Sequence, residues 1–108
     1  MIPTYINRKS MMGDQDRMVG GWEYHSELTP YDQFIFYNAI GSHENYFYQP
    51  IAVATQIVNG TNYKFMCIAK PRVPGLPSFY AIVEIYKPID GTPYAVSIYP
   101  AEEYRYKK

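Results

Sequence analysis

The hydrophobic positions of this chain follow two different periods, and the change between them predicts the order of its elements. Apolar and polar residues alternate over short runs on both sides of residues 29 to 41, as expected for strands with one buried face. Between these runs, Phe34, Ile35 and the residues from Tyr37 to Ile40 form one broad apolar side of a helix. The pattern therefore predicts one helix between an early strand and a later set of strands.

The predicted helix has a start signal and a stop signal. Thr29 is followed by Pro30, and Asp32 lies three positions after Thr29. A Thr hydroxyl caps a free N–H, Pro at the first helical position loses no hydrogen bond, and a carboxylate suits the positive end of the helix dipole. The helix then runs through the residues QFIFYNAI, and Gly41 supplies the stop.

Five runs are typical of strands: Trp22 to Leu28, Ile51 to Val58, Thr61 to Ala69, Phe79 to Tyr86, and Tyr94 to Tyr99. The pair Asn59-Gly60 predicts a hairpin with a type I′ turn, in which both central residues have positive φ. The turn from Ile89 to Pro93 joins the last two runs. The segment PRVPGLP predicts a connecting loop, because its prolines cannot enter a central strand. The expected fold class is α+β, with one helix packed on a four- to five-stranded antiparallel sheet.

The length of 108 residues is that of a single domain. Residues 1 to 18 are polar and follow neither period, which predicts a flexible amino-terminal arm. Residues 19 to 108 are expected to form the one domain, with a glycine pair at its start.

Composition excludes several classes of function. Ten basic residues balance ten acidic ones, so neither nucleic acid nor an anionic membrane surface is an expected partner. Cys67 is the only cysteine, and His25 and His43 lack the spacing of metal ligands, so we expect no disulfide, metal or cofactor. No apolar run is long enough for a signal peptide or a membrane span. The expected location is the cytoplasm, or outside the cell if a leader has been removed.

The connectivity brings three separate segments together. In an antiparallel meander alternate turns lie at the same edge, so Asn59-Gly60 and Asp90-Gly91 share one end of the sheet. If the first strand pairs with the strand from Ile51, Gly20-Gly21 reaches that end too. The result is a narrow, largely uncharged wedge, and exposed apolar residues gathered in one place commonly mark a binding site. Its expected flanking residues are Val19, Trp22, Val58 and Tyr94.

The residues from Gln56 to Gly60 fit the Gln-x-Val-x-Gly signature of the cystatin superfamily of cysteine-protease inhibitors. The run QIVNGTNY is similar to the corresponding stretch of the stefins, the disulfide-free branch of that family. The resemblance extends from Gly20 to about Tyr99 and includes the upstream glycine, the helix and the order of the hairpins. It implies a cystatin-like fold and reversible, competitive, tight-binding inhibition of papain-like cysteine peptidases of the cathepsin type.

The resemblance also implies which residues contact the peptidase. Gly60 would allow a sharp turn close to the cleft wall, Val58 would supply apolar contact, and Gln56 would help to fix the hairpin. We therefore expect Gly60→Glu to weaken peptidase binding far more than it lowers folding stability. Met18 and Val19 would lie in the substrate-side subsites. The complete set of expected contact residues is Val19, Gly20, Gly21, Gln56, Ile57, Val58, Asn59, Gly60, Pro93 and Tyr94.

The chain departs from the family pattern at several points. The second hairpin has Pro93-Tyr94 where the secreted branch has Pro-Trp, a tryptophan that stefins also lack. The stretch from Ser42 to Glu44 has His where legumain inhibitors of the family have Asn, so that second activity is not expected. The run from Asn59 to Thr61 is formally a glycosylation sequon, and a glycan there would obstruct insertion.

Two other hypotheses remain open. The cystatin-like shape could serve as a protein-binding module without peptidase inhibition, because fold alone does not give function. An enzyme with Cys67 as nucleophile and His25 or His43 as base is the third hypothesis, although a mid-strand cysteine is usually a small buried hydrophobe. We expect a monomer, and exchange of strands by opening the hairpin at Val58 stays open as a route to a dimer.

Overall fold

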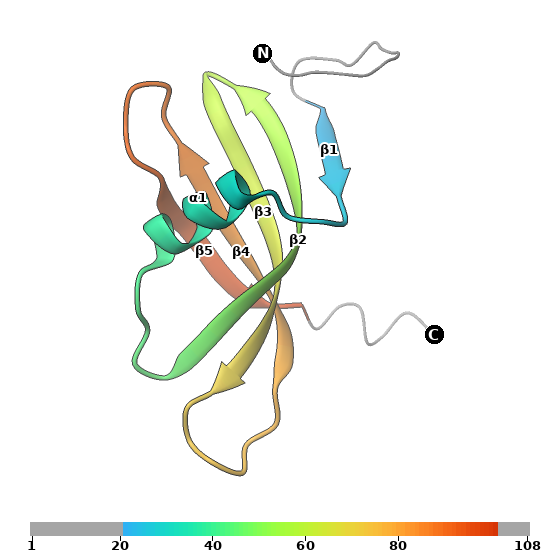
Figure 1. Cartoon of the computed structure of the whole chain (residues 1–108), viewed down its shortest axis with the longest axis vertical. Coiled ribbons are helices and arrows are strands. Elements are labelled where there is room, and N and C mark those ends of the chain that lie inside the picture. Colours follow the sequence, from blue (N-terminus) through green and yellow to red (C-terminus); the bar gives the residue numbers. More distant parts are fainter. Residues whose placement is uncertain (1–20, 102–108) are drawn as a thin grey trace.

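The computed structural model describes residues 21 to 101, in which one helix packs on a five-stranded antiparallel sheet (Figure 1). Each strand pairs with its neighbours in sequence, so the sheet order is β1-β2-β3-β4-β5. The predicted α+β arrangement is confirmed, whereas the predicted arm over residues 1 to 18 lies outside the described residues. The elements are β1 (Trp22–His25), α1 (Pro30–Ile40), β2 (Tyr46–Val58), β3 (Gly60–Pro71), β4 (Phe79–Lys87) and β5 (Tyr94–Pro100).

Helix α1 begins and ends at the residues that the sequence predicts. The Thr29 hydroxyl accepts a hydrogen bond from the Asp32 backbone N–H at 3.0 Å, and the Asp32 carboxylate accepts one from the Thr29 N–H at the same distance. This reciprocal pair satisfies two N–H groups that the first turn leaves free. At the other end, Gly41 has a φ of 61° and donates its N–H to the Tyr37 carbonyl. Gly41 therefore ends the helix as expected.

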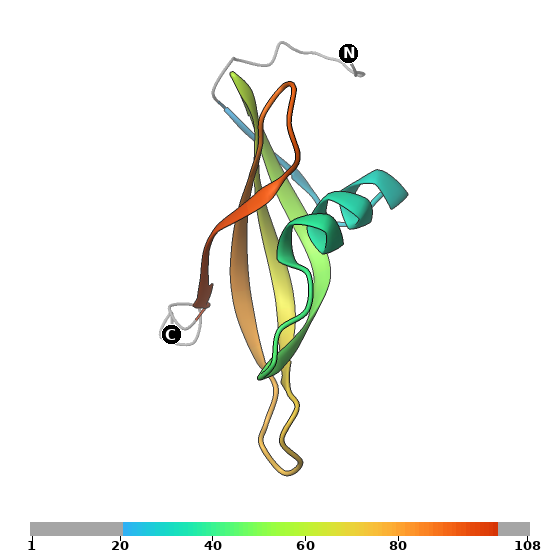
Figure 2. The ribbon, with the colours of Figure 1, turned by 90° about the vertical axis from the view of Figure 1, so that its left-hand side faces the viewer.

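The core lies between α1 and one face of the sheet, and Figure 2 shows the helix on one side of the curved strands. Ile35 and Phe36 are fully buried, and the Phe36 ring meets the Phe65 ring of β3 edge-on, with centroids 5.0 Å apart. Tyr63 stacks on Phe65 from the same strand face. Side chains on a strand alternate between faces, so the residues between these in β3 lie on the opposite side of the sheet.

The two strands on the amino-terminal side of the sheet differ in length from the prediction. Strand β1 ends at His25, and β2 begins at Tyr46, earlier than predicted. Pro50 lies inside β2 and is followed by a bulge at Ile51. Strand β1 pairs only with residues 53 to 56 of β2, so the earlier part of β2 is an edge of the sheet. A proline is tolerated there because edge strands and bulges do not need its missing N–H.

The later strands are close to their predicted bounds. Strand β3 continues to Pro71, so the first proline of the predicted loop ends the strand instead of lying beyond it. The loop itself covers residues 72 to 78 and contains Gly75 at a φ of 92°. Strands β4 and β5 extend one residue further than predicted, to Lys87 and Pro100.

We expect Phe65→Ala to lower the free energy of unfolding by about 3–5 kcal/mol, because it leaves a cavity against Phe36. The matched control is Phe34→Ala on the helix, where the ring is 57% exposed and the loss is expected to stay below about 1 kcal/mol. Urea denaturation of the three proteins measures the difference. Equal losses in the two variants would contradict the assigned core.

Candidate functional site

The three segments expected to converge do meet at one edge of the sheet. The β2–β3 hairpin and the β4–β5 loop lie at the same end of the molecule in both views, and β1 begins there (Figures 1 and 2). The register agrees, because Trp22 at the start of β1 pairs with Gln56 near the end of β2. Gly21 directly precedes this pair. Val19 and Gly20, like Met18, lie outside the described residues. We call this edge the rim; it contains Gly21, residues 56 to 61 and residues 88 to 94.

The turn at the tip of the β2–β3 hairpin is not the predicted type I′ turn. Ile57 pairs with Thr61 and Val58 with Gly60, so Asn59 alone lies between paired positions. A two-residue type I′ turn would instead pair Val58 with Thr61. The observed register is that of a three-residue loop, whose last residue takes positive φ, and Gly60 has a φ of 109°.

Gly60 is required by the protein's own packing. A Cβ at this position would lie 2.6 Å from the Lys87 carbonyl oxygen and 2.7 Å from the Tyr86 hydroxyl oxygen. The Tyr86 hydroxyl also donates a hydrogen bond to the backbone carbonyl of Asn59. A side chain at position 60 would therefore displace the tip from β4 and strain its backbone. The structure corrects the expectation that Gly60→Glu would leave the fold nearly intact, because the substitution also strains the tip; its effect on peptidase binding stays a prediction.

Tyr86 connects the tip to the second loop of the rim. Its ring meets the Tyr94 ring edge-on, with centroids 5.8 Å apart, and Tyr94 is 53% exposed. Pro93, which was expected to contact a partner, is buried beside the exposed Tyr94. Its position is therefore that of a support for the loop, and Tyr94 presents the accessible surface. No local pattern around Tyr86 predicts this role, because the Asn59 carbonyl that it contacts is 27 residues away in the chain.

Gln56 has the tethering role that was expected of it. Its side-chain oxygen accepts a hydrogen bond of 2.8 Å from the Asn62 side chain, and the two residues are direct partners across β2 and β3. This bond ties the strands together just below the tip.

The accessible surface of the rim is largely apolar. Ile57 is 56% exposed and Val58 is 39% exposed. On the helix side, the tip and the second loop border a shallow hollow of about 370 Å³, with Ile57, Ile89 and Tyr31 around it. On the other side, the Trp22 ring has the Lys64 ammonium 4.8 Å from its centre. Within the described residues, the rim is therefore open: Ile57, Val58, Ile89 and Tyr94 face solvent together with the Asp90 carboxylate, and Pro93 is buried.

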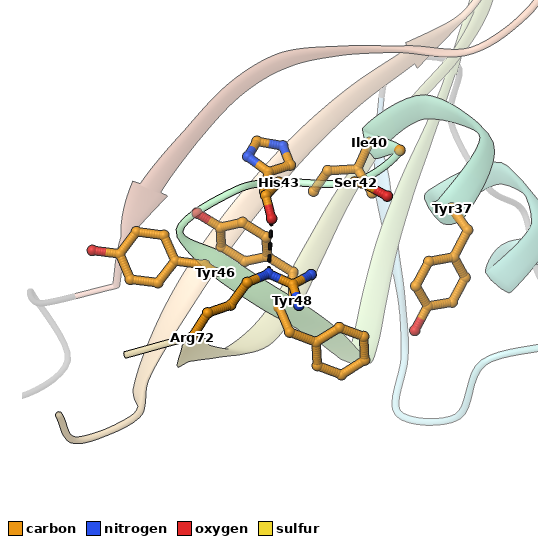
Figure 3. A pocket seen from close by; sticks show the side chains of 9 residues that line it. Tyr37, Ile40, Ser42, His43, Tyr46, Tyr48 and Arg72 are labelled. Atoms are coloured by element: carbon orange, nitrogen blue, oxygen red, sulfur yellow. Dashed lines mark hydrogen bonds between the residues drawn. The ribbon is translucent and has the colours of Figure 1, made fainter. Parts of the chain in front are cut away.

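A second hollow, of about 210 Å³, lies between the end of α1 and the start of β2 (Figure 3). Its wall includes Tyr37, Tyr46, Tyr48 and His43, and Arg72 donates its Nε–H to the His43 carbonyl at 2.8 Å. This bond ties the loop after α1 to the end of β3. Arg72 supplies the one guanidinium of this lining, and no carboxylate lies among its residues.

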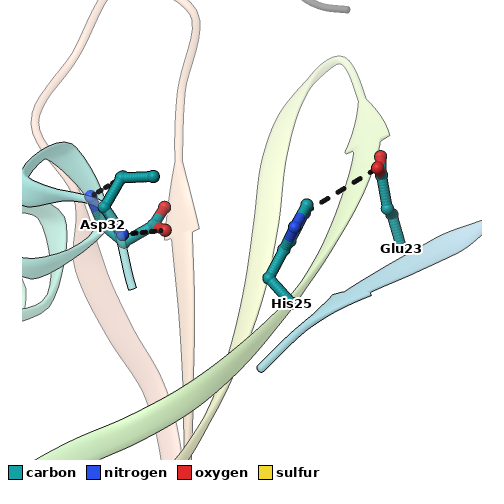
Figure 4. A network of polar contacts seen from close by, with 4 residues as sticks. Glu23, His25 and Asp32 are labelled. Atoms are coloured by element: carbon teal, nitrogen blue, oxygen red, sulfur yellow. Dashed lines mark hydrogen bonds and ion pairs between the residues drawn. The ribbon is translucent and has the colours of Figure 1, made fainter. Parts of the chain in front are cut away.

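Cys67 does not have the surroundings of a nucleophile. Its side chain is fully buried in the core, and burial raises the pKa of its thiol to about 12. His25 lies on β1, where its half-exposed side chain has Nε2 4.0 Å from the Glu23 carboxylate oxygen Oε2 (Figure 4). His43 belongs to the loop after α1. A catalytic cysteine needs a lowered pKa and a nearby base. The described residues do not support the enzyme hypothesis that rested on Cys67.

Within residues 21 to 101, no group of three or more His, Cys, Asp or Glu side chains could hold a metal ion. Helix α1, the one helix of residues 21 to 101, has 11 residues and is too short to span a bilayer.

Comparisons of the chain with protein-family models, with curated proteins and with solved structures gave no match. The family is therefore not shown, and the resemblance rests on the residues of the signature and on the order of the elements.

We expect Tyr86→Phe to loosen the tip without disturbing the core, because only the hydrogen bond to the Asn59 carbonyl is lost. The free energy of unfolding should fall by about 0.5–1.5 kcal/mol. Hydrogen exchange of the Gly60 and Thr61 amides should accelerate, while exchange in the centre of β3 stays unchanged. Tyr80→Phe is the control, since that hydroxyl makes no hydrogen bond with the described residues. Unchanged exchange at the tip of Tyr86→Phe would contradict the connection.

The buried thiol of Cys67 predicts a dependence of stability on alkaline pH. The unfolded thiol ionises near its ordinary pKa of 9.0, whereas in the folded protein the pKa is about 12. Below pH 9 both states hold the proton, and between these two values only the unfolded state releases it, which favours unfolding. The stability advantage of the parent over Cys67→Ala should therefore shrink as pH rises through this window. Urea titrations at several pH values measure it, and a constant difference would contradict the burial of the thiol.

Proposed function

We propose that this protein is a reversible, competitive inhibitor of papain-like cysteine peptidases, and that the rim is the part that enters the active-site cleft. The observation that carries the proposal is the meeting of Gly21, the Gln56-to-Gly60 hairpin and the Tyr94 loop at one open, apolar edge. The same residues supply the Gln-x-Val-x-Gly signature. A cystatin-like fold is part of the proposal, and the five-stranded antiparallel sheet with its one helix is compatible with it.

The proposed mechanism requires no chemistry from this protein. A cleft that accepts an extended substrate also accepts a slim edge made of tight turns. Inhibitor interfaces of this kind bury about 800 Å² on each partner, which is enough to exclude substrate. Because the tip crosses the cleft as a folded hairpin, it does not offer a peptide bond to the catalytic cysteine in a geometry that can be attacked. The complex then dissociates without product.

Each segment has its own task in the proposal. Val58 and Asn59 at the tip lie over the catalytic centre, and Tyr94 occupies the leaving-group side of the cleft. Val19 and Gly20 lead into the substrate-side subsites, where Gly21 lets the chain approach closely. The Tyr86 contacts hold the tip and the Tyr94 loop in one arrangement. Such preorganisation lowers the entropy lost on binding.

The proposal favours the cytoplasm or another compartment without N-glycosylation. Asn59 is exposed at the tip, so a glycan on this sequon would cover the proposed contact surface. The single, buried cysteine also suits a reducing compartment, because the fold does not depend on a disulfide.

A protein-binding module is the second candidate, and one observation favours it. The face of the sheet opposite α1 has exposed aromatic side chains, among them Trp22 at 46%, Tyr24 at 70% and Tyr80 at 57%. Aromatic residues are enriched at protein interfaces. Trp22 pairs with Gln56 and borders the rim, whereas Tyr80 pairs with Ile68 toward the far end of β3, so a partner bound around Tyr80 would leave the tip accessible.

A titration of papain with the full chain tests the proposal, and two variants assign the effect to a surface. The parent should inhibit at a molar ratio near one to one. Ile57→Glu should weaken inhibition at least about tenfold, equal to about 1.4 kcal/mol, because a charge enters an apolar contact. Leu76→Glu is the matched control: Leu76 is 59% exposed, close to the 56% of Ile57, but lies in the loop at the opposite end of the sheet.

The variants also separate the two candidates. Leu76→Glu should inhibit like the parent, and circular dichroism should show that all three proteins are folded. An absence of inhibition by the folded parent at micromolar concentration would reject the inhibitor proposal and favour the binding module. Equal weakening in both variants would show that inhibition does not depend on the rim.

A further inference from the structure

The rim contains a dipeptide whose chemistry is independent of any partner. Asn59 is the one asparagine of the chain that is followed by glycine. The other four precede Arg8, Ala39, Tyr46 and Tyr63, whose side chains hinder the attack of their backbone nitrogen on the asparagine side-chain carbonyl. An asparagine side chain can close a five-membered ring on the next backbone nitrogen, and glycine offers the least hindrance because it lacks a Cβ.

The structure leaves the Asn59 side chain free for this reaction. Asn59 is exposed, and it alone lies between paired positions of β2 and β3. Its backbone carbonyl is held by Tyr86, but its side-chain amide makes no hydrogen bond with the described residues. An amide held by a neighbouring side chain, as that of Asn62 is held by Gln56, would have to break its hydrogen bond before it could react.

We propose that Asn59-Gly60 is a site of spontaneous modification that limits the working life of the tip. The Gly60 amide loses its proton to solvent base, and its nitrogen forms a bond to the Asn59 side-chain carbonyl carbon. The bond from that carbon to the amide nitrogen breaks, and ammonia leaves with a proton from water. Water then opens the cyclic imide at one of its two carbonyls. The products at position 59 are aspartate and isoaspartate, and the whole reaction consumes one water and releases one ammonia.

Both products alter the tip, and isoaspartate alters it most. Each adds a negative charge to a largely apolar surface. In isoaspartate the main chain gains a methylene group, and the carbonyl that accepted the Tyr86 hydrogen bond becomes part of a free carboxylate. The fit of Gly60 against β4 has no room for a displaced backbone, since even a Cβ would lie 2.6 Å from the Lys87 carbonyl oxygen. The tip must therefore leave Tyr86 when isoaspartate forms.

The part of this inference that concerns inhibition rests on the proposed function, whereas the modification itself does not. If the rim enters a cleft, a tip with an added charge and a longer backbone fits it poorly. Inhibitory activity would then fall as the protein ages. The fall would be faster at higher pH, because the Gly60 nitrogen must lose its proton before it attacks.

The test is to age the full-length folded protein at neutral and at mildly alkaline pH and to map its peptides by mass spectrometry. Methyl labelling by a protein-isoaspartate methyltransferase identifies the isoaspartate product. Asn59→Gln is the matched variant, because it keeps the amide but would have to close a larger and slower ring. We expect modification at position 59 with the other asparagines unchanged, a faster rate at the higher pH, and no label in Asn59→Gln. A synthetic peptide of the sequence QIVNGTNY gives the rate at which the same asparagine is modified in the absence of the fold.

The outcomes separate the steps. If position 59 of the folded protein stays unmodified after the peptide has converted, the modification proposal is wrong. If it converts but hydrogen exchange at Gly60 and Thr61 is unchanged, the proposed displacement of the tip is wrong. Papain titration then compares fresh and modified protein, with an expected weakening of at least about tenfold. Fresh protein that does not inhibit would reject the proposed function and leave the modification standing; equal inhibition by both would reject its effect on inhibition.

Discussion

The contact between Phe36 of α1 and Phe65 of β3 is the one on which the rest of the structure depends. A single helix covers one face of the sheet, and these two fully buried rings lie at the centre of that layer. Val53, Val83 and Ile85 of the strands are buried in the same layer, whereas many side chains of the opposite face are exposed. A sheet with one helix gains its stability from this one layer. The rim can be left open because it contributes little to the core.

The meander then decides what the rim contains. Two of its connections and the start of β1 must lie at the same end, whatever their sequences, because each strand reverses the direction of the last. The meander does not determine how firmly these segments are held relative to one another. Tyr86 supplies that, through its hydrogen bond to the Asn59 carbonyl and its ring contact with Tyr94. A partner that binds here meets an arrangement that is already formed, which lowers the cost of binding.

The tip also shows that residues of a signature can have different physical duties. Gly60 is needed because its neighbours on β4 leave no room for a Cβ. Gln56 ties two strands together through Asn62. The side chain of Asn59, in contrast, has no packing or hydrogen-bonding duty among the described residues. The Asn59 side chain is therefore available either to contact a partner or to be modified.

The amino-acid sequence by itself determined the order of elements, the caps of α1, the positions of the hairpins and the edge at which the glycines meet. These follow from local propensity, hydrophobic period and the alternation of turns, all of which act over a few residues. The turn type at Asn59, the burial of Pro93, the bulge after Pro50 and the role of Tyr86 were decided only by the tertiary structure. Tyr86 and Asn59 are 27 residues apart, and no local pattern records that β4 passes beneath the tip at contact distance. The tertiary structure also decided that the rim is exposed, because this depends on where the helix and the strands end relative to one another in space.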